Sequence, residues 1–520
     1  MIPYETICYC PFATTPTVKK DSMTSPLHLA GKEPQQAGDR RWIALVVLCI
    51  GMLMIILDAT IVNVALPSIQ SDLGFSQSSL AWVVNAYLIA FGGLLLLAGR
   101  LGDLLGRRRI FLIGLTVFTG ASLLCGLAQS QELLVGARFV QGVGGALTSA
   151  VILGMVVTMF PEPGEQARAI GVYSFTAAAG GAIGLLAGGA LTQAINWHWI
   201  FFVNLPIGVG AWLLTPRLIQ RDEGIGLREG ADAAGAVLIT GALMIAVYTI
   251  VKASDYGWGS ARTLGFGALA LLLLAAFIVR ESTARQPLMP LRVFRSRTMS
   301  SANLVQALMV AGMFGMFFLG ALYLQRVLGY DALEVGLAFL PVALLIGALS
   351  VGVSARLNMR FGARATLLPA LALIVAGLAL FARAPVDANY LPDILPVMLL
   401  LGIGAGLAFP SLMTLAMSGA SGSDAGLASG LVNTAQQVGG ALGLAVLATL
   451  STTHTHNLLS AGHSNASALT SGYHLAFVIG AALVLSAIGL AAALLRPASE
   501  PAAELAGVGE PEPAYSEEAA

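Results

Sequence analysis

Two charged residues lie inside long apolar stretches of the sequence, and together they could carry out proton chemistry. Asp58 falls within the run Leu57 to Pro67, and Arg138 opens the run Arg-Phe-Val-Gln-Gly-Val-Gly-Gly. An ionisable side chain inside a bilayer costs several kcal/mol, so such residues usually serve function. Asp58 is the only acid placed deeply enough to neutralise Arg138. We therefore predict that the two side chains form an electrostatically coupled pair that binds and releases a proton.

Each of the two residues also has a purely structural interpretation. Asp58 could snorkel or act as a cap near a helix end, and Arg138 could lie at a rim, held by Gln141 or by backbone carbonyls. Counting about 1.5 Å per residue from Trp42 places Asp58 about 24 Å from the cytoplasmic edge, in the outer half of the membrane. Arg138 lies close to the outer end of its own stretch, at a similar depth. This shared depth favours the pair.

A second group of charges occupies the short link from Gly99 to Arg109 between two apolar stretches. Its arginines are typical of a segment that stays in the cytoplasm. Glycines on both sides of Asp103 also predict a tight turn that presents this carboxylate to the N-terminus of a neighbouring helix, in a contact that forms in one conformation and breaks in another. The residues assigned to this conformational gate are Gly99, Arg100, Gly102, Asp103, Gly106 and Arg107.

Small and amide-bearing residues recur in other apolar stretches. Glycines at three- and four-residue spacing allow two helix backbones to approach closely, and generic helix packing would use them in the same way. The helix-packing candidates are Gly184, Gly188 and Gly189. Amide side chains within apolar helices are expected to face an aqueous cavity. The candidate cavity-lining residues are Asn63, Gln141, Asn433, Gln436 and Gln437.

Residues that could support other chemistry are scattered or absent. Cys8 and Cys10 stand in a polar N-terminal segment with too few further ligands for a metal. No phosphate-binding loop of the form Gly-x-x-x-x-Gly-Lys-Ser/Thr occurs, nor a His-Glu-x-x-His or Gly-x-Ser-x-Gly motif. Four histidines lie in or beside one polar loop, which is expected to be solvated and free of metal: His454, His456, His463 and His474. We therefore expect that the protein is not an enzyme and needs no cofactor. Its energy source is expected to be an ion gradient, a partner or the substrate's own gradient.

The composition indicates which elements must position these residues. The chain has 520 residues, of which 57% are hydrophobic and 10% charged, with a mean hydropathy of +0.82. Such a sequence is typical of a polytopic helical membrane protein. Counting stretches long enough to cross a bilayer gives about 14 helices. They fall near residues 42–66, 80–99, 110–128, 133–159, 169–193, 199–217, 233–252, 263–280, 300–325, 335–356, 365–383, 394–417, 426–450 and 473–495.

The distribution of basic residues predicts the orientation. Loops that remain in the cytoplasm keep Lys and Arg. With the N-terminus inside, 22 of the 27 basic residues fall in inside segments, and Arg138 lies within a span. The outside segments hold only Lys252, Arg262, Arg326 and Arg383. We therefore expect both termini in the cytoplasm. The zero net charge gives no reason to expect a nucleic-acid partner.

A weak internal repeat divides the chain. The link Gly99 to Arg109 matches the segment Ala355 to Arg364 at its arginines and at Gly106 and Gly362. Two related six-helix bundles would leave two additional helices between them. The expected organisation is a disordered cytoplasmic tail at 1–40, an N-terminal bundle at 41–220, two extra helices at 221–285, a C-terminal bundle at 286–496 and a disordered cytoplasmic tail at 497–520.

These motifs together resemble the major facilitator superfamily, in its 14-helix drug:proton antiporter branch. Gly99 to Arg109 resembles the superfamily's cytoplasmic loop motif, Leu57 to Pro67 the branch's first-helix motif and Arg138 to Gly145 its fourth-helix motif. The segment Asn196 to Gly208 resembles the branch's entry into helix six. The resemblance implies alternating access of two bundles, proton coupling by Asp58 and Arg138, and gating by Asp103 with Arg107.

Two positions depart from the family pattern. Leu185 follows Gly184 where the antiporter signature usually has proline, and Met359 replaces the acid that corresponds to Asp103 in the second-half loop. We expect a monomeric, proton-driven exporter of amphipathic small molecules in a bacterial cytoplasmic membrane. The alternatives are proton-coupled uptake of a small metabolite, which the missing proline leaves open, a non-transporting membrane sensor, and a membrane enzyme, which would need a catalytic cluster.

Overall fold

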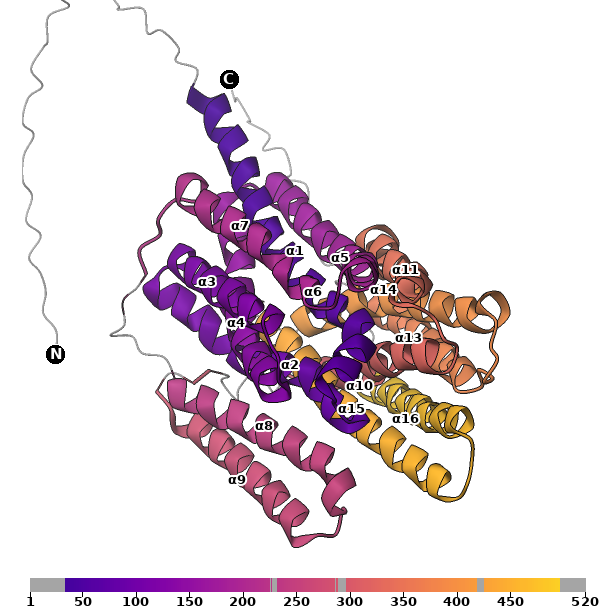
Figure 1. Cartoon of the computed structure of the whole chain (residues 1–520). Helices are drawn as coiled ribbons and strands as arrows, with labels where there is room; N and C mark the ends of the chain where they lie inside the picture. Colours follow the sequence, from indigo (N-terminus) through magenta and orange to yellow (C-terminus); the bar gives the residue numbers. More distant parts are fainter. Residues whose placement is uncertain are drawn as a thin grey trace, which may run out of the picture.

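The computed structural model describes residues 33–224, 226, 232–285, 287–288, 296–418 and 425–495. All regular elements in these residues are helical (Figure 1). The expected tails at 1–40 and 497–520, which include Cys8 and Cys10, lie outside the described residues, except for residues 33–40. There the first helix, α1, begins at Glu33, ahead of the expected boundary at residue 41.

The helices follow one another in three groups. The first comprises α1 (Glu33–Leu73), α2 (Gln77–Leu105), α3 (Arg107–Gly126), α4 (Gln131–Met159), α5 (Pro163–Ala194), α6 (Trp199–Phe202) and α7 (Asn204–Leu218). The second is the hairpin of α8 (Ala233–Tyr256) and α9 (Ala261–Thr283). The third comprises α10 (Arg297–Arg326), α11 (Ala332–Ala348), η3 (Leu349–Val353), α12 (Ser354–Phe361), α13 (Ala363–Phe381), η4 (Tyr390–Ile394), α14 (Leu395–Ser418), α15 (Ala425–Ser460) and α16 (Asn465–Leu494).

Each apolar stretch expected from the sequence coincides closely with a helix or with consecutive helical segments. Among the described residues, twelve helices are long and apolar enough to cross a membrane. The expected number was about 14. Two of the expected helices are not among these twelve candidate spans. One is α5, which has 32 residues, and the other is α11, which is apolar but has 17 residues. The structure therefore supports a polytopic helical membrane protein with twelve candidate spans.

Short polar side chains mark where several of these helices begin. Ser76 and Ser130 accept a hydrogen bond from the backbone three residues on, at the starts of α2 and α4. Asp331 does so at the start of α11 and forms a reciprocal capping box with Glu334. The first N–H groups of a helix have no partner within it, so these caps fix where each of the three helices begins.

The helices of the first and third groups form two halves that lie side by side (Figure 1). In the first half α1 packs against α5 and α7, and α4 packs against α2 and α3. In the second half α10 packs against α15 and α16, and α13 against α14 and α16. The halves meet where α5 contacts α11 and where α2 contacts α15. This arrangement places the polar residues of α1 and α4 inside the first half.

Glycines allow α5 to lie against helices of both halves. A Cβ atom added at Gly184 would come within 2.0 Å of Thr60 Oγ1 on α1, and one at Gly188 within 2.7 Å of the Ile61 carbonyl oxygen. At Gly189 it would meet the Ala332 carbonyl oxygen of α11 at 2.6 Å. The helix-packing candidates therefore lie at two close backbone approaches, one within the first half and one between the halves.

The hairpin of α8 and α9 lies at the edge of the molecule, where α8 contacts both α2 and α15 (Figure 1). Arg280 near the end of α9 donates from Nε to both carboxylate oxygens of Asp232, at 3.1 and 3.2 Å, while Asp232 also caps α8. A small cavity of about 160 Å³, lined almost wholly by apolar atoms, lies between the hairpin and these two helices. The hairpin therefore covers a contact between the halves.

The internal repeat is visible in the backbone. Gly106 joins α2 to α3 with φ 93°, and Gly362 joins α12 to α13 with φ 86°. Arg108 Nη2 donates to the Pro216 carbonyl near the end of α7, and Arg364 Nη2 donates to the Ala492 carbonyl near the end of α16. Each half thus turns on a single glycine and ties that turn to its own last helix.

Replacing Gly362 by alanine should destabilise the protein by about 1–3 kcal/mol, because a Cβ strains this positive-φ backbone although nothing lies within 4 Å of it. The thermal midpoint of detergent-purified protein measures the effect. Gly120→Ala is the matched control, since Gly120 lies within α3 with open space around it. Alanine is favoured in a helix interior, so this control should be neutral or stabilising. Equal midpoints for both variants would contradict the assignment.

Candidate proton site

Asp58 and Arg138 meet in the interior of the first half. Asp58 on α1 is 0% exposed and Arg138 on α4 is 1% exposed. Arg138 Nη1 lies 2.5 Å from Asp58 Oδ2, and its Nε donates to the Val83 carbonyl of α2 at 2.9 Å. A buried charge pair of this kind must be closely matched, since removing either partner leaves the other charge without compensation.

Two amide side chains complete the surroundings of the carboxylate. Gln141 Nε2 on α4 donates to Asp58 Oδ1 at 2.7 Å, and Asn204 Nδ2 on α7 donates to the same oxygen at 3.0 Å. Gln141 also accepts from Arg138 Nη1 at 2.7 Å and donates to Ser122 Oγ of α3 at 2.8 Å. The carboxylate is therefore held by three donors from two helices other than its own.

Aromatic rings enclose the guanidinium. Arg138 Cζ lies 4.5 Å from the ring centre of Tyr87 and 5.7 Å from that of Phe201. The negative face of an aromatic ring stabilises a cation, most strongly where water is excluded. Together with the Val83 carbonyl and Gln141, these contacts leave Arg138 partners that do not depend on the charge of Asp58.

Of the expected cavity-lining residues, Gln141 is fully buried, and its amide is hydrogen-bonded to both Asp58 and Arg138. Asn63 is half-buried and donates to the Ala59 carbonyl of its own helix at 3.2 Å. Gln436 and Gln437 are half-buried on α15, and Asn433 is exposed there. Gln437 lies against Gly92 of α2, where the two halves meet.

Asn204 was not among the residues expected at the site. The signal for it was an asparagine inside an apolar stretch, directly before Leu-Pro in the segment Asn196 to Gly208. The same segment supplies Trp197, whose Nε1 donates to Asp72 Oδ2 of α1 at 2.9 Å. His198 stacks on Trp197, and burial lowers the pKa of His198. This segment therefore fastens α6 and α7 to α1 at two points, Asp72 and Asp58.

The link from Gly99 to Arg109, which was predicted to form a conformational gate, differs from its expected shape. The last turns of α2 contain Gly99, Arg100, Gly102 and Asp103. Gly102 packs there against Val151 of α4. The turn is confined to Gly106. Asp103 Oδ1 accepts from Arg107 Nη2 at 3.1 Å, and Arg107 Nη1 donates to the Gly154 carbonyl at 3.0 Å.

The carboxylate at a helix N-terminus in this region belongs to a different residue. Asp222, in the segment after α7, accepts from the backbone N–H of Arg107 at 2.5 Å and of Arg108 at 3.1 Å. Asp103 was expected in such a role, but its side chain pairs with Arg107 one helical turn away. The sequence signal for Asp222 is weak, because it stands 115 residues from the backbone group that it binds.

Three hydrogen bonds join the halves at the end of the molecule that carries the α10–α11 loop. Gln193 Nε2 of α5 donates to Asp331 Oδ2 at 2.8 Å, and Gln325 Nε2 of α10 donates to the Val64 carbonyl of α1 at 2.9 Å. Arg326 donates to Gln70 Oε1. We call these contacts the outer hydrogen bonds.

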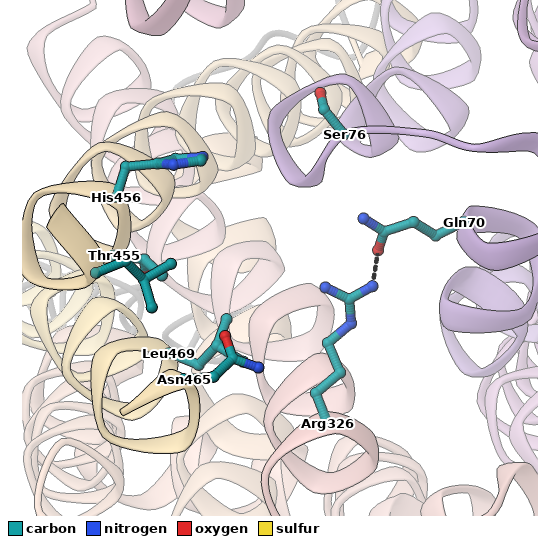
Figure 2. Close-up of a pocket in the computed structure, with 8 residues that line it drawn as sticks. Gln70, Ser76, Arg326, Thr455, His456, Asn465 and Leu469 are labelled. Atoms are coloured by element: carbon teal, nitrogen blue, oxygen red, sulfur yellow. Dashed lines mark hydrogen bonds between the residues drawn. The ribbon is translucent and has the colours of Figure 1, made fainter. Parts of the chain in front are cut away.

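A cavity of about 490 Å³ opens beside the Arg326 contact. Figure 2 shows Arg326 reaching toward Gln70 on one side, with His456 across the cavity from them. The walls of this cavity come from both halves. They comprise Gln70, Ser76, Arg326, Thr455, His456, Leu459, Asn465 and Leu469. Within the described part of the chain, no group of three or more His, Cys, Asp or Glu side chains could hold a metal ion.

The sequence profile described as Major Facilitator Superfamily matches residues 48–444. The chain belongs to this superfamily. The prediction of its family from the loop and helix motifs is therefore confirmed. As a multi-pass member with bacterial relatives, it is a transporter of the cytoplasmic membrane and not an enzyme.

Similar curated proteins cover most of the chain. The puromycin resistance protein pur8 of Streptomyces alboniger is 41% identical over 89% of this chain and 93% of its own length. The cephamycin export protein CmcT of Amycolatopsis lactamdurans is 39% identical over 78% and 84% of the two chains. The tetracenomycin C resistance and export protein of Streptomyces glaucescens is 37% identical over 79% and 76%.

Solved structures share the fold at low sequence identity. A bacterial homologue of the human lysosomal transporter Spinster, inward-facing and unoccupied, has a TM-score of 0.60 at 18% identity and covers 89% of this chain and 97% of its own. A mutant of the nucleoside transporter NupG has a TM-score of 0.60 at 13% identity, covering 87% and 100% of the two chains. The arrangement of helices is therefore that of the superfamily.

Arg138→Gln should destabilise the protein by about 3–5 kcal/mol, since it leaves the buried Asp58 carboxylate without its cation. Asp58→Asn should cost less, because the Val83 carbonyl, Tyr87 and Phe201 still stabilise the guanidinium. The double variant should lose less than the sum of the two, by about 0.5–3 kcal/mol. Thermal midpoints of purified protein in detergent test this. Asn63→Ala is the matched control on α1, because Asn63 bonds only within its own helix in the contacts described above. Strict additivity of the two single losses would rule out the coupling.

Proposed function

We propose that this protein is a proton-coupled secondary transporter that exports amphipathic small molecules across the cytoplasmic membrane by alternating access. The observation that carries the proposal is similarity over nearly the whole chain to a resistance protein and to two export proteins. Their names mention puromycin, cephamycin and tetracenomycin C. We infer that this chain exports a compound of the same broad kind, and that it works as a monomer.

The buried pair supports protons as the driving ion. Asp58 is the one carboxylate held against a guanidinium in the interior of the first half among the described ion pairs. When a proton binds Asp58, the Coulomb attraction to Arg138 is lost, while Tyr87, Phe201 and the Val83 carbonyl continue to stabilise the guanidinium. The proton therefore weakens one contact between α1 and α4 without leaving Arg138 unpartnered. This is the local change that we assign to coupling.

We further propose 14 spans with both termini in the cytoplasm. The twelve candidate spans would be joined by α5 and by α11 with the helical segments that continue it, η3 and α12. The α2–α3 and α12–α13 turns, rich in arginine, would then face the cytoplasm in both halves. The residues Gly99, Arg100, Gly102, Asp103, Gly106 and Arg107 would form the cytoplasmic gate of the first half. Met359, which is 81% exposed, leaves the second half without an equivalent acid.

In this orientation the outer hydrogen bonds close the external side. Three of the polar contacts described between the halves lie at that end. The remaining one, from Thr434 to the Gly92 carbonyl at 3.4 Å, joins the middle of α2 to α15. We therefore assign the structure to an outward-closed state. The polar residues Asn63, Asn433, Gln436 and Gln437 would line the substrate path, and the outer cavity beside Arg326 would lie on the exit side.

Export is tested by everted membrane vesicles, whose lumen corresponds to the cell exterior. Acidifying the lumen should drive accumulation of an exported compound, and ethidium, puromycin and tetracenomycin C serve as probes. Asp58→Asn should reduce accumulation at least about tenfold, because a single lost proton site removes the coupling. Asp387→Asn, an exposed acid in a loop, is the matched control and should behave as wild type.

Uptake by symport predicts the opposite gradient dependence. Leu185, where the antiporter signature has proline, is the observation that keeps this alternative in view. A symporter would accumulate a probe in everted vesicles only when the lumen is more alkaline than the medium. Wild-type accumulation of that kind, or full activity of Asp58→Asn, would contradict the proposed exporter.

Removing an outer hydrogen bond should increase the share of molecules that open to the outside. Each such bond contributes about 0.5–1.5 kcal/mol, so Gln193→Ala should raise the outward-open population about two- to tenfold. Spin labels at the exposed positions Glu132 and Asn457, one in each half, report the distance in a cysteine-free background. The control is Gln166→Ala, whose hydrogen bond to the Val157 carbonyl stays within the first half. An unchanged distance distribution for Gln193→Ala would contradict the assigned closure.

A further inference from the structure

The turn between α2 and α3 receives support from a part of the chain outside the recognised loop motif. The first N–H groups of α3 have no acceptor within the helix. Both carboxylate oxygens of Asp222 are used there, one by the Arg107 N–H and one by the Arg108 N–H. A negative charge at this position also opposes the positive end of the α3 dipole.

The backbone around Asp222 is fitted closely to the same turn. The Gly226 N–H donates to the Leu104 carbonyl at 3.1 Å. A Cβ added at Gly224 would lie 2.1 Å from that carbonyl oxygen, and one at Gly106 would lie 2.7 Å from the Asp222 carbonyl oxygen. The segment after α7 and the turn therefore touch backbone to backbone, which only glycine permits at both positions.

This contact fixes the position of the Arg107 backbone, from which its side chain extends. Arg107 reaches back to Asp103 at 3.1 Å and across to the Gly154 carbonyl of α4 at 3.0 Å. Its own N–H is bonded to Asp222. A shift of the turn would therefore displace the guanidinium from both of its partners, although Asp222 touches neither of them in the contacts described here.

The same segment leads to the hairpin that covers the contact between the halves. It continues to Asp232, which caps α8, and α8 packs against α2 of one half and α15 of the other.

We propose that Asp222 is a positioning residue of the cytoplasmic gate, which holds Gly106 to Arg108 in place and thereby aligns Arg107 with Asp103. The proposal rests on the alternating-access function given above. It adds to the gate a residue outside the loop motif.

The test measures distances between the halves at the cytoplasmic side. Spin labels at Glu162, before α5, and at Met359, in α12, occupy exposed positions in different halves of a cysteine-free protein. Asp222→Ala should increase the population outside the wild-type distance range about threefold or more, because the turn loses both acceptors. Asp222→Ser, which retains one acceptor, should fall between Asp222→Ala and wild type. Glu223→Gln, the exposed neighbouring acid, should match wild type.

A double variant separates positioning from simple capping of α3. If Asp222 acts through Arg107, adding Asp222→Ala to Arg107→Gln should change the distances no further. Additive changes, or a lowered thermal midpoint with unchanged distances, would overturn the proposal. The distance measurement requires no transported compound. The role of Asp222 can therefore be overturned while vesicle export succeeds, and export can be overturned while the distances support the role of Asp222. If Asp222→Ala does not fold, the Asp222→Ser comparison decides the question.

Discussion

A guanidinium buried inside a membrane protein must be compensated on every side, and this requirement organises the first half of the molecule. Arg138 is 1% exposed, and its partners come from separate helices: Asp58 from α1, the Val83 carbonyl from α2 and Gln141 from α4. Asn204 brings α7 to the same carboxylate. Because each contact satisfies a group that would otherwise be buried without a partner, these helices are held together as one body.

The contact between the halves is built differently. The polar groups around Arg138 are fully buried, whereas the outer hydrogen bonds involve side chains near the surface, such as Asp331 and Arg326. Exposed hydrogen bonds exchange with water at little net cost. The backbone approach at Gly189 adds packing without interlocking side chains. Two bodies that are firm inside and joined by exchangeable contacts can move against each other, as alternating access requires.

The α8–α9 hairpin lies where that movement must be accommodated. Its helices are fastened to each other by Asp232 and Arg280, and α8 touches both halves. The segment that enters the hairpin binds the α2–α3 turn through Asp222. In the other half, Gly362 and Arg364 repeat the turn and its tie to the last helix. The halves therefore share one design, to which the first adds the Asp103–Arg107 ion pair and the contact of Asp222 with the turn.

The sequence by itself determined the helices, the family and the pairing of Asp58 with Arg138, because hydropathy, turn glycines and the cost of charge in a bilayer act locally along the chain. It offered Gln141 as an alternative partner of Arg138, but it could not show that Gln141 also binds Asp58, that Asn204 reaches the same carboxylate, or that Asp222 caps α3. Those contacts join residues far apart in the chain, such as Asp58 and Asn204, 146 positions apart. Only the packed structure decides which buried polar groups satisfy one another, since each must find its partner among neighbours that the fold brings together.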